Sequence, residues 1–298
     1  MPEIVDYLKP ESLQKLARME IVARLVVEGF ISGMHRSPHR GFSVEFAEHR
    51  RYVPGDEIRH INWKAYARSD RYYIKQYEEE TNLRGYILLD CSASMSYASG
   101  AVSKLFYGKC LAAALSYLML KQQDSVGLVT FDHAVRSYVP PRAVPTHLKA
   151  IAHQIDEARI GGETSLSNIF HNLAERIKRR GLIIIISDLF DNLKDILSGL
   201  SHFRHKKHEV MIFQVLDPDE ISFPFRNWTM FNNLEKDGHQ LLTEPQRVRA
   251  AYLQSFGEFT REVRRNCRQK RIDYEQLDTA IPFDVALAAY LAKRNGNV

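Results

Sequence analysis

The sequence predicts an α/β protein built on a doubly wound, mostly parallel β-sheet. Three observations predict this fold: short apolar runs without polar alternation, segments of helical period between them, and repetition of that pair from about residue 85 onward. Runs of Ile, Leu and Val without alternation are typical of parallel strands that helices cover on both faces. Strands that alternate with helices along the chain are typical of a doubly wound sheet.

The apolar runs are the predicted strands. The clearest is GLIIIISD, because its four successive isoleucines leave no polar face. A weaker strand, VRSYV, is expected to stop at Pro140-Pro141, because proline cannot donate to a β-ladder. The expected strands of the sheet are residues 85–90, 125–131, 135–139, 181–188, 209–216 and 272–278.

Segments of helical period separate these strands. The expected helices are residues 101–122, 145–158, 166–180, 193–203, 246–269 and 283–294. A β-hairpin is expected around Lys236-Asp237-Gly238, because Asp-Gly favours a tight turn. We interpret residues 85–298 as one α/β domain, with this hairpin as an insertion at about 217–245.

Residues 1–84 differ in character and predict an N-terminal extension that packs on the main domain. A helical pattern begins at Pro10-Glu11-Ser12, and Gly29, Gly33 and Ser37-Pro38 are expected to end it. The stretch that follows is rich in arginine and aromatic residues. Its alternation predicts short strands near residues 42–46 and 72–76, on either side of a Pro-Gly-Asp turn.

Composition excludes several classes of protein. The 298 residues are 45% hydrophobic and 26% charged, which is ordinary for a globular chain. A net charge of +5 does not by itself imply nucleic acid, and no nucleic-acid-binding motif accompanies it. The apolar runs are too short for a membrane helix, and the N-terminus lacks the apolar run of a secretory signal. We therefore expect a cytoplasmic protein without membrane insertion, whose three cysteines are reduced packing residues.

Side-chain oxygens cluster in sequence where two predicted strands end. GYILLD ends at Asp90 and continues with Ser92 and Ser94, whose alternation lets all three side chains point one way in an extended loop. GLIIIISD ends at Asp188, and GGETSL supplies Thr164 from a loop between the two. Ligands of open parallel sheets gather beyond the carboxyl ends of the strands. An oxygen-only set of this kind suits Mg²⁺, or another hard divalent cation such as Mn²⁺.

The balance of charge in this set predicts a further ligand. Three of the five side chains are uncharged hydroxyls, so a bound ion would stay electron-poor and accept one more anionic ligand. An Asp or Glu from a partner protein would complete the coordination. The alternative is that Asp90 and Asp188 only cap helices or form turns, which is the commoner role of such residues.

This constellation resembles the metal-ion-dependent adhesion site of the von Willebrand factor type A domain. The family pattern is Asp-x-Ser-x-Ser after the first strand, a Thr on a later loop and an Asp after the fourth strand. The matching positions, in the family's order, are Asp90, Ser92, Ser94, Thr164 and Asp188. The sequence departs from the family at Leu189, where a glycine often follows the last Asp. The resemblance implies a metal-binding interaction module.

A second resemblance lies before the first strand of the sheet. EFAEHRRYVPGDEIRHINWKAYARSDRYYIKQYEEE resembles the segment that precedes the A-type fold in bacterial proteins of domain of unknown function 58. That resemblance implies a partner or adaptor of a MoxR-type AAA+ ATPase, or a contact with a client of such an ATPase. The matching positions are Arg51-Tyr52, Pro54-Gly55-Asp56, Arg59, Ile61, Trp63 and Ala67-Arg68. We interpret Asp56 and Arg59 as an internal ion pair with Trp63 packed over it.

The motifs of common enzyme classes are absent. There is no Gly-x-x-x-x-Gly-Lys-Ser/Thr phosphate loop and no Gly-x-Ser-x-Gly nucleophile turn. A haloacid-dehalogenase-like phosphatase needs a second Asp two residues after Asp90, where this chain has Ser92. We therefore predict a non-enzymatic interaction protein. A metal-dependent hydrolase and a structural domain with a vestigial metal site remain as alternatives, and the sequence carries no signal of oligomeric state.

Two other groups of residues are interpreted as surface features. His202, His205 and His208 have a spacing that suggests a metal site, but Arg and Lys neighbours disfavour a cation, so an exposed loop is expected. The basic run at 261–271 is expected to be the solvated face of a long helix.

Overall fold

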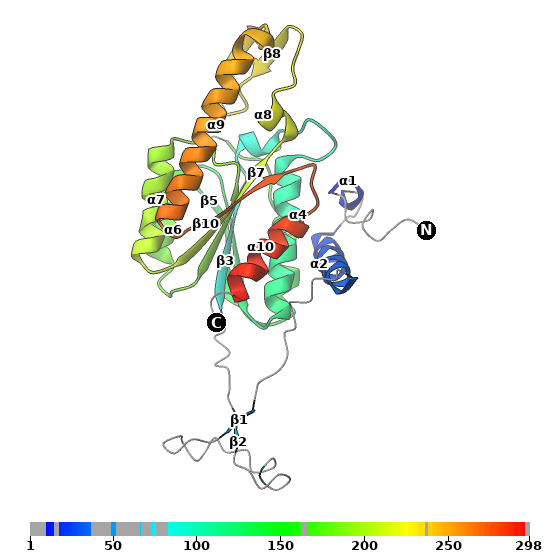
Figure 1. The fold of residues 1–298 in the computed structure, drawn as a ribbon, viewed down its shortest axis with the longest axis vertical. Coiled ribbons are helices and arrows are strands. Elements are labelled where there is room, and N and C mark those ends of the chain that lie inside the picture. Colours follow the sequence, from blue (N-terminus) through cyan, green and yellow to red (C-terminus); the bar gives the residue numbers. More distant parts are fainter. Residues whose placement is uncertain are drawn as a thin grey trace. The chain divides into compact units, whose positions relative to one another are not determined.

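Figure 1 shows the fold of the protein as a computed structural model. The structure describes residues 10–14, 18–36, 49–51, 66, 73–75, 83–162, 166–235 and 238–295. The chain forms two compact units. The main unit comprises Met1–Met34 and Leu83–Val298, and the second unit comprises His35–Asn82. The extension predicted over residues 1–84 is thus divided, because its N-terminal part belongs to the main unit.

A six-stranded sheet with the order β10-β7-β6-β3-β4-β5 forms the centre of the main unit. Each neighbouring pair is parallel except β4 and β5, which are antiparallel. The strands are β3 (Arg84–Asp90), β4 (Ser125–Phe131), β5 (Val135–Arg142), β6 (Leu182–Ser187), β7 (Glu209–Leu216) and β10 (Asp273–Asp278). The predicted doubly wound, mostly parallel sheet is confirmed. After β3 the chain adds β4 and β5 on one side of β3, and it then adds β6, β7 and β10 on the other side. The direction in which strands are added therefore reverses at β3.

Helices cover both faces of this sheet, with one apolar core on each side (Figure 1). One core contains residues of α2 (Met19–Arg36), α4 (Lys104–Lys121), α5 (His147–Glu157) and α10 (Asp284–Asn295). The other contains residues of α6 (Leu166–Arg176), α7 (Leu193–His205) and α9 (Pro245–Gln269). The four central strands, β3, β4, β6 and β7, are buried on both sides, which explains their continuous apolar sequences.

The N-terminal helices differ from the prediction. A single turn, α1 (Pro10–Leu13), precedes α2, and α2 continues through Gly29 and Gly33 to Arg36. The prediction that the glycines help to end the helix is wrong. Glycine costs a helix about 1 kcal/mol per residue, whereas α2 gains more from burying its apolar face. The helix ends before Ser37-Pro38, as expected for the residues ahead of a proline.

Strand β5 also differs from the prediction, because it continues through Pro140 and Pro141 to Arg142. Proline is tolerated here since β5 is the edge strand of the sheet. The pairing with β4 shifts at this point: Leu128 lies opposite Val139, and Val126 lies opposite Arg142. Two residues of β5 therefore face one residue of β4, which is a β-bulge.

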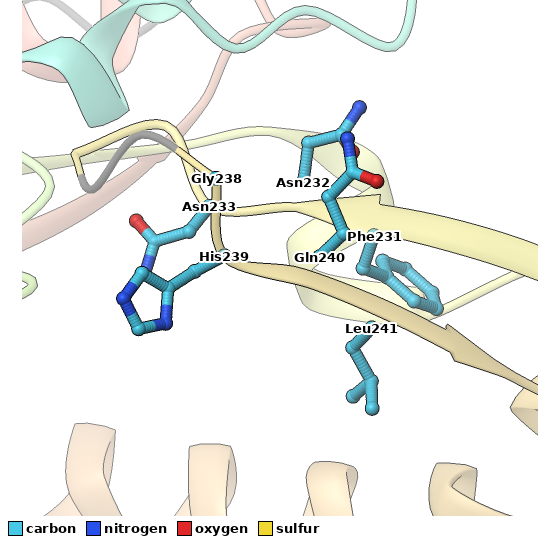
Figure 2. A pocket seen from close by; sticks show the side chains of 7 residues that line it. All are labelled: Phe231, Asn232, Asn233, Gly238, His239, Gln240 and Leu241. Carbon is cyan, nitrogen blue, oxygen red and sulfur yellow. The ribbon is translucent and has the colours of Figure 1, made fainter.

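The predicted hairpin is confirmed as β8 (Thr229–Asn232) and β9 (Gln240–Thr243), which pair antiparallel. Gly238 has a φ of +79°, the left-handed conformation that glycine adopts without strain, while Lys236 and Asp237 lie outside the described residues. Figure 2 shows the end of the hairpin, where Asn232 and Gln240 lie near each other and Phe231 and Leu241 lie along the strands.

The hairpin is joined to the sheet through α8 (Pro218–Ser222), which follows β7 directly. Four aromatic rings, from Phe223, Phe225, Phe231 and Tyr252, pack together and attach the hairpin to α9. We refer to α8, the hairpin and residues 245–256 of α9 as the arm. Because only Asp217 separates the end of β7 from the start of α8, the arm starts at the carboxyl edge of the sheet (Figure 1).

The second unit contains a short antiparallel pair, β1 (His49–Arg51) with β2 (Tyr73–Lys75). The strand predicted near 72–76 is present, and β1 was not predicted. The strand predicted at 42–46 and the Asp56, Arg59 and Trp63 group lie outside the described residues.

Among the helices that the structure describes, none has the length and apolar character needed to cross a membrane.

Candidate metal centre

The two predicted carboxylate ligands lie on adjacent strand ends. Asp90 is the last residue of β3, and Asp188 directly follows β6. These strands are parallel neighbours, with Leu89 opposite Ile186. Both carboxylates are buried, since Asp90 is 0% and Asp188 1% exposed. They therefore occupy the point where the strand order reverses, which is the usual ligand position in an open α/β sheet.

The loop after β3 brings the predicted serines to the same place. The amide of Ser92 donates to Asp90 Oδ1 at 2.8 Å, which folds the loop back over the carboxylate. The Ser92 and Ser94 hydroxyl oxygens are 3.1 Å apart. Ser187, which the sequence analysis missed, donates its hydroxyl to Asp90 Oδ2 at 2.6 Å. Asp90 is thus fixed by hydrogen bonds from its own loop and from β6.

Thr164 lies outside the described residues, but the residues on either side of it contact both loops of the site. Gly161 donates its amide to the carbonyl of Cys91 at 2.7 Å, and the carbonyl of Gly162 accepts from Ala93 at 3.1 Å. On the other side, Leu166 donates its amide to Asp191 Oδ2 at 2.9 Å. The chain therefore joins the Asp90 loop two residues before Thr164 and the Asp188 loop two residues after it.

The electrostatics of the site favour a cation. Burial, and then the neighbouring charge of Asp188, raise the pKa of Asp90 above its ordinary value, although hydrogen bonds from Ser187 and Ser92 oppose the shift. Two carboxylates that share a buried site are stabilised by a proton or a cation between them. The donor set contains only oxygens, which fits a hard divalent ion.

One basic residue of the site was not predicted. Lys104, the first residue of α4, is 0% exposed, and its ammonium group lies 2.7 Å from Asp188 Oδ2 and 2.6 Å from Glu220 Oε1. Although burial alone would lower it, the two carboxylates raise the pKa of Lys104, so the side chain is charged. No local pattern marks this contact, because it joins residues far apart in the chain.

Leu189, where the sequence departs from the adhesion-site family, has a φ of +60°. This left-handed conformation is the one for which glycine is favoured, which accounts for a glycine at the same place in that family. The leucine side chain is 0% exposed and belongs to one of the two cores. Its burial offsets the cost of the backbone conformation, so the loop keeps its path without a glycine.

The other candidate groups do not form a metal site. His202 and His205 are exposed as expected, but they lie on α7 and not on a loop, and His208 is buried, so the expectation of an exposed loop is wrong. The three cysteines are buried as expected, and burial raises the pKa of Cys91 to about 12. Within the described part of the chain, no three His, Cys, Asp or Glu side chains form a group suited to a metal.

Comparisons with known proteins match most of the chain. The family model described as "Protein of unknown function DUF58" matches residues 48–262. The uncharacterized protein Rv1480 of Mycobacterium tuberculosis is 27% identical over 225 residues, which cover 74% of this chain and 69% of that protein.

Two solved structures are also similar. The conserved hypothetical protein BatB of Bacteroides thetaiotaomicron is 16% identical, with 71% of this chain and 98% of that chain covered and a TM-score of 0.47. An aerotolerance-related membrane protein of Bacteroides fragilis is 18% identical, with coverage of 71% and 99% and a TM-score of 0.47. The predicted family is confirmed by the family model: its match spans well over half of the chain, and the protein therefore belongs to the DUF58 family of proteins of unknown function.

Proposed function

We propose that the protein is a non-enzymatic interaction module that binds a carboxylate of a partner protein through a divalent cation, Mg²⁺ or Mn²⁺. The residues that would hold the ion are Asp90, Ser92, Ser94, Thr164 and Asp188. The observation that carries the proposal is the pair of buried carboxylates at the switch point of the sheet, with two serine hydroxyls beside them. When bound, the ion supplies a Lewis-acidic position for one external carboxylate.

The chain's own residues prepare this site. Ser92 and Ser187 hold the two oxygens of Asp90 in fixed positions, and Lys104 and the amide of Phe190 hold those of Asp188. Fixing both carboxylates before a ligand arrives lowers the entropic cost of binding. The hydrogen bonds of Gly161 and Gly162 with the Asp90 loop support a Thr164 contribution to the same site.

The proposed partner is a MoxR-type AAA+ ATPase or a client of that ATPase, as the family resemblance implies. The arm, which starts at the carboxyl edge of the sheet, supports a protein partner, because large apolar side chains are exposed in and beside its hairpin. Trp228 is 68%, Met230 52% and Leu242 59% exposed. Three buried thiols are consistent with the cytoplasmic location that we propose.

The hydrolase alternative has less support. A hydrolase needs a free general acid or base beside the reacting group. Among the described residues, Asp188 and Glu220 are already paired with Lys104, and Asp90, which has no ion pair, is assigned to the metal in this proposal. We therefore propose that the protein is not an enzyme.

The Asp90→Asn variant tests the metal proposal. We expect wild-type protein to bind Mn²⁺ in calorimetry and to melt at a higher temperature with the ion, because a ligand that binds only the folded state stabilises it. Asp90→Asn is expected to lose at least about tenfold in Mn²⁺ affinity, since one of two carboxylates is removed. Without metal, the variant is expected to melt no lower than wild type at pH 8, because the buried charge beside Asp188 is gone.

Asp195→Asn is the matched control, because Asp195 is an exposed carboxylate in the first turn of α7. It is expected to bind Mn²⁺ like wild type. Equal Mn²⁺ affinity in wild type and Asp90→Asn would contradict the metal site, and loss of folded Asp90→Asn protein would assign Asp90 a structural role. A purified MoxR-type ATPase is expected to be retained on immobilised wild-type protein with Mg²⁺ and released by a chelator.

A further inference from the structure

Lys104 places a permanent positive charge inside the candidate metal centre. Its ammonium group contacts Asp188 Oδ2 at 2.7 Å and Glu220 Oε1 at 2.6 Å, and it lies 4.8 Å from the centre of the Phe190 ring. The lysine side chain is 0% exposed, and those of Asp188 and Glu220 are 2% and 15% exposed. Charge-assisted hydrogen bonds of this length in a buried place are strong.

The lysine is held from the side of α8 as well. Glu220 accepts a hydrogen bond from the amide of Asp217 through Oε2, while its Oε1 binds Lys104. Asp217 in turn caps α8 and accepts from the amide of Ser99 at 2.8 Å. Tyr97 donates to Asp219 at 3.2 Å. These hydrogen bonds hold α8 and Glu220 in place, and Lys104 cannot turn away from Asp188 without also losing its contact with Glu220.

The pairing leaves the two predicted carboxylate ligands in different electrostatic states. Lys104 pairs with Asp188 but shares its single charge with Glu220, whereas Asp90 makes no ion pair among the described residues and accepts only neutral donors. A divalent ion between the two predicted ligands therefore meets less negative charge than it would without the lysine, and it keeps more of its own positive charge. In a buried site with a low effective dielectric constant, that remaining charge strongly favours an incoming anion.

We infer that Lys104 is a specificity-determining residue of the site: it weakens the binding of a divalent ion alone and makes that binding depend on an external carboxylate. The inference rests on the proposed function and concerns how the same site is regulated. It means that metal and partner bind cooperatively, because each supplies the charge that the other lacks.

The test measures Mn²⁺ affinity by calorimetry with sodium acetate as the carboxylate probe and sodium chloride of equal ionic strength as the reference. Wild-type protein is expected to bind Mn²⁺ several-fold more tightly with acetate. Lys104→Met keeps the length of the side chain and removes its charge. It is expected to bind Mn²⁺ at least about tenfold more tightly than wild type without acetate, and to lose the acetate effect.

Two further variants separate charge from folding. Lys104→Met leaves Asp188 and Glu220 buried without a cation, which can prevent folding. The double variant Lys104→Met/Glu220→Gln removes one of these negative charges together with the lysine, so Asp188 loses its cation while the net charge of the group stays that of wild type. It is expected to bind Mn²⁺ more tightly than wild type, by a smaller factor than Lys104→Met. Glu220→Gln alone keeps the lysine and is expected to retain the acetate effect. Circular dichroism confirms that each protein is folded.

The outcomes distinguish the role of Lys104 from the existence of the metal site on which it rests. If wild type binds Mn²⁺ through Asp90 but the folded lysine variants show unchanged affinity and an unchanged acetate effect, the role of Lys104 is overturned and the metal site stands. If neither wild type nor the folded lysine variants bind Mn²⁺, both the metal site and the inference fall.

Discussion

His208 is a titratable side chain enclosed at the start of β7. It is 1% exposed and lies 6.1 Å from the ring of Phe203, measured between ring centres. Burial lowers its pKa below the ordinary value, and the nearby charge of Lys206 acts in the same direction. The nearby backbone of Ile177 and Gly181 opposes the shift. The folded protein therefore holds His208 in its neutral form at neutral pH.

This shift predicts a loss of stability on mild acidification. An unfolded histidine has a pKa of about 6.5, so below that pH the unfolded chain binds a proton at this position while folded His208 stays neutral. His208 therefore does not lower the free energy of unfolding above about pH 6.5. The free energy of unfolding falls as the pH drops from there toward the lower pKa of folded His208. Urea unfolding at pH 7.5 and 5.5 measures the effect. Wild type is expected to lose more stability between these pH values than His208→Gln. The variant keeps His147, whose pKa is also lowered, so the difference between the two proteins reports His208 alone. Equal losses in the two proteins would contradict the assignment.

Individual site residues differ in how far the sequence predicts them. Asp90 and Asp188 could be predicted as neighbours, because each ends an apolar run and parallel strands end at one edge. Lys104 could not, because its partners Asp188 and Glu220 reach it only through tertiary packing. Ser187 precedes Asp188 in the same run, but its direction toward Asp90 depends on the pairing of β3 with β6.

At the scale of elements, the bulge in β5 depends on a glycine in the neighbouring strand. Gly127 of β4 lies opposite Pro140 and Pro141. A Cβ atom at Gly127 would lie 2.6 Å from the carbonyl oxygen of Val139 and 2.9 Å from the nitrogen of Pro141. Both atoms belong to the backbone, so neither can move away by a change of rotamer. The edge strand can therefore carry two prolines only because its neighbour has no side chain at this point.

Gly127→Ala is expected to lower the free energy of unfolding by about 1–3 kcal/mol, because the added methyl group forces the two strands apart. The measurement is the urea midpoint at constant slope. Gly100→Ala is the control, since a Cβ at Gly100 meets no atom within 4 Å. Its expected change lies within about 0.5 kcal/mol. A midpoint for Gly127→Ala equal to that of Gly100→Ala would mean that β5 adjusts without cost.

The bounds of elements could be predicted where local pattern and packing agree. The predicted strands at residues 125–131 and 209–216 are β4 and β7, with the same bounds. Here the apolar run that ends at a turn in the sequence is also the segment buried in the sheet. The ends of α2 and β5 could not be predicted from glycine and proline alone. In both cases the deciding factor is tertiary: the buried face of α2 and the edge position of β5.

At the scale of the whole molecule, α2 completes a core whose other members lie far along the chain. Val22, Val26 and Phe30 are buried in the same core as α4. The hydroxyl of Tyr117 on α4 donates to Glu28 at 3.3 Å, and Arg24 lies 5.7 Å from the Tyr117 ring. The second unit, His35–Asn82, intervenes in the sequence between these partners. The doubly wound, mostly parallel class of the sheet could be predicted from alternation, whereas the packing of α2 on this core joins segments that no local pattern links.

Val26→Asp tests whether α2 is an integral part of the main unit. Val26 is 3% exposed, so the substitution places an unpaired carboxylate in the core and is expected to cost about 3–5 kcal/mol. Leu25→Asp makes the same chemical change one residue earlier, at a side chain that is 44% exposed, and is expected to cost less than about 1 kcal/mol. Leucine has a higher helix propensity than valine, so the propensity penalty is larger for Leu25→Asp, and a lower urea midpoint for Val26→Asp must come from packing. If Val26→Asp unfolds at the same urea concentration as Leu25→Asp, then α2 does not contribute to the core, and the main unit must be stable without its N-terminal helix.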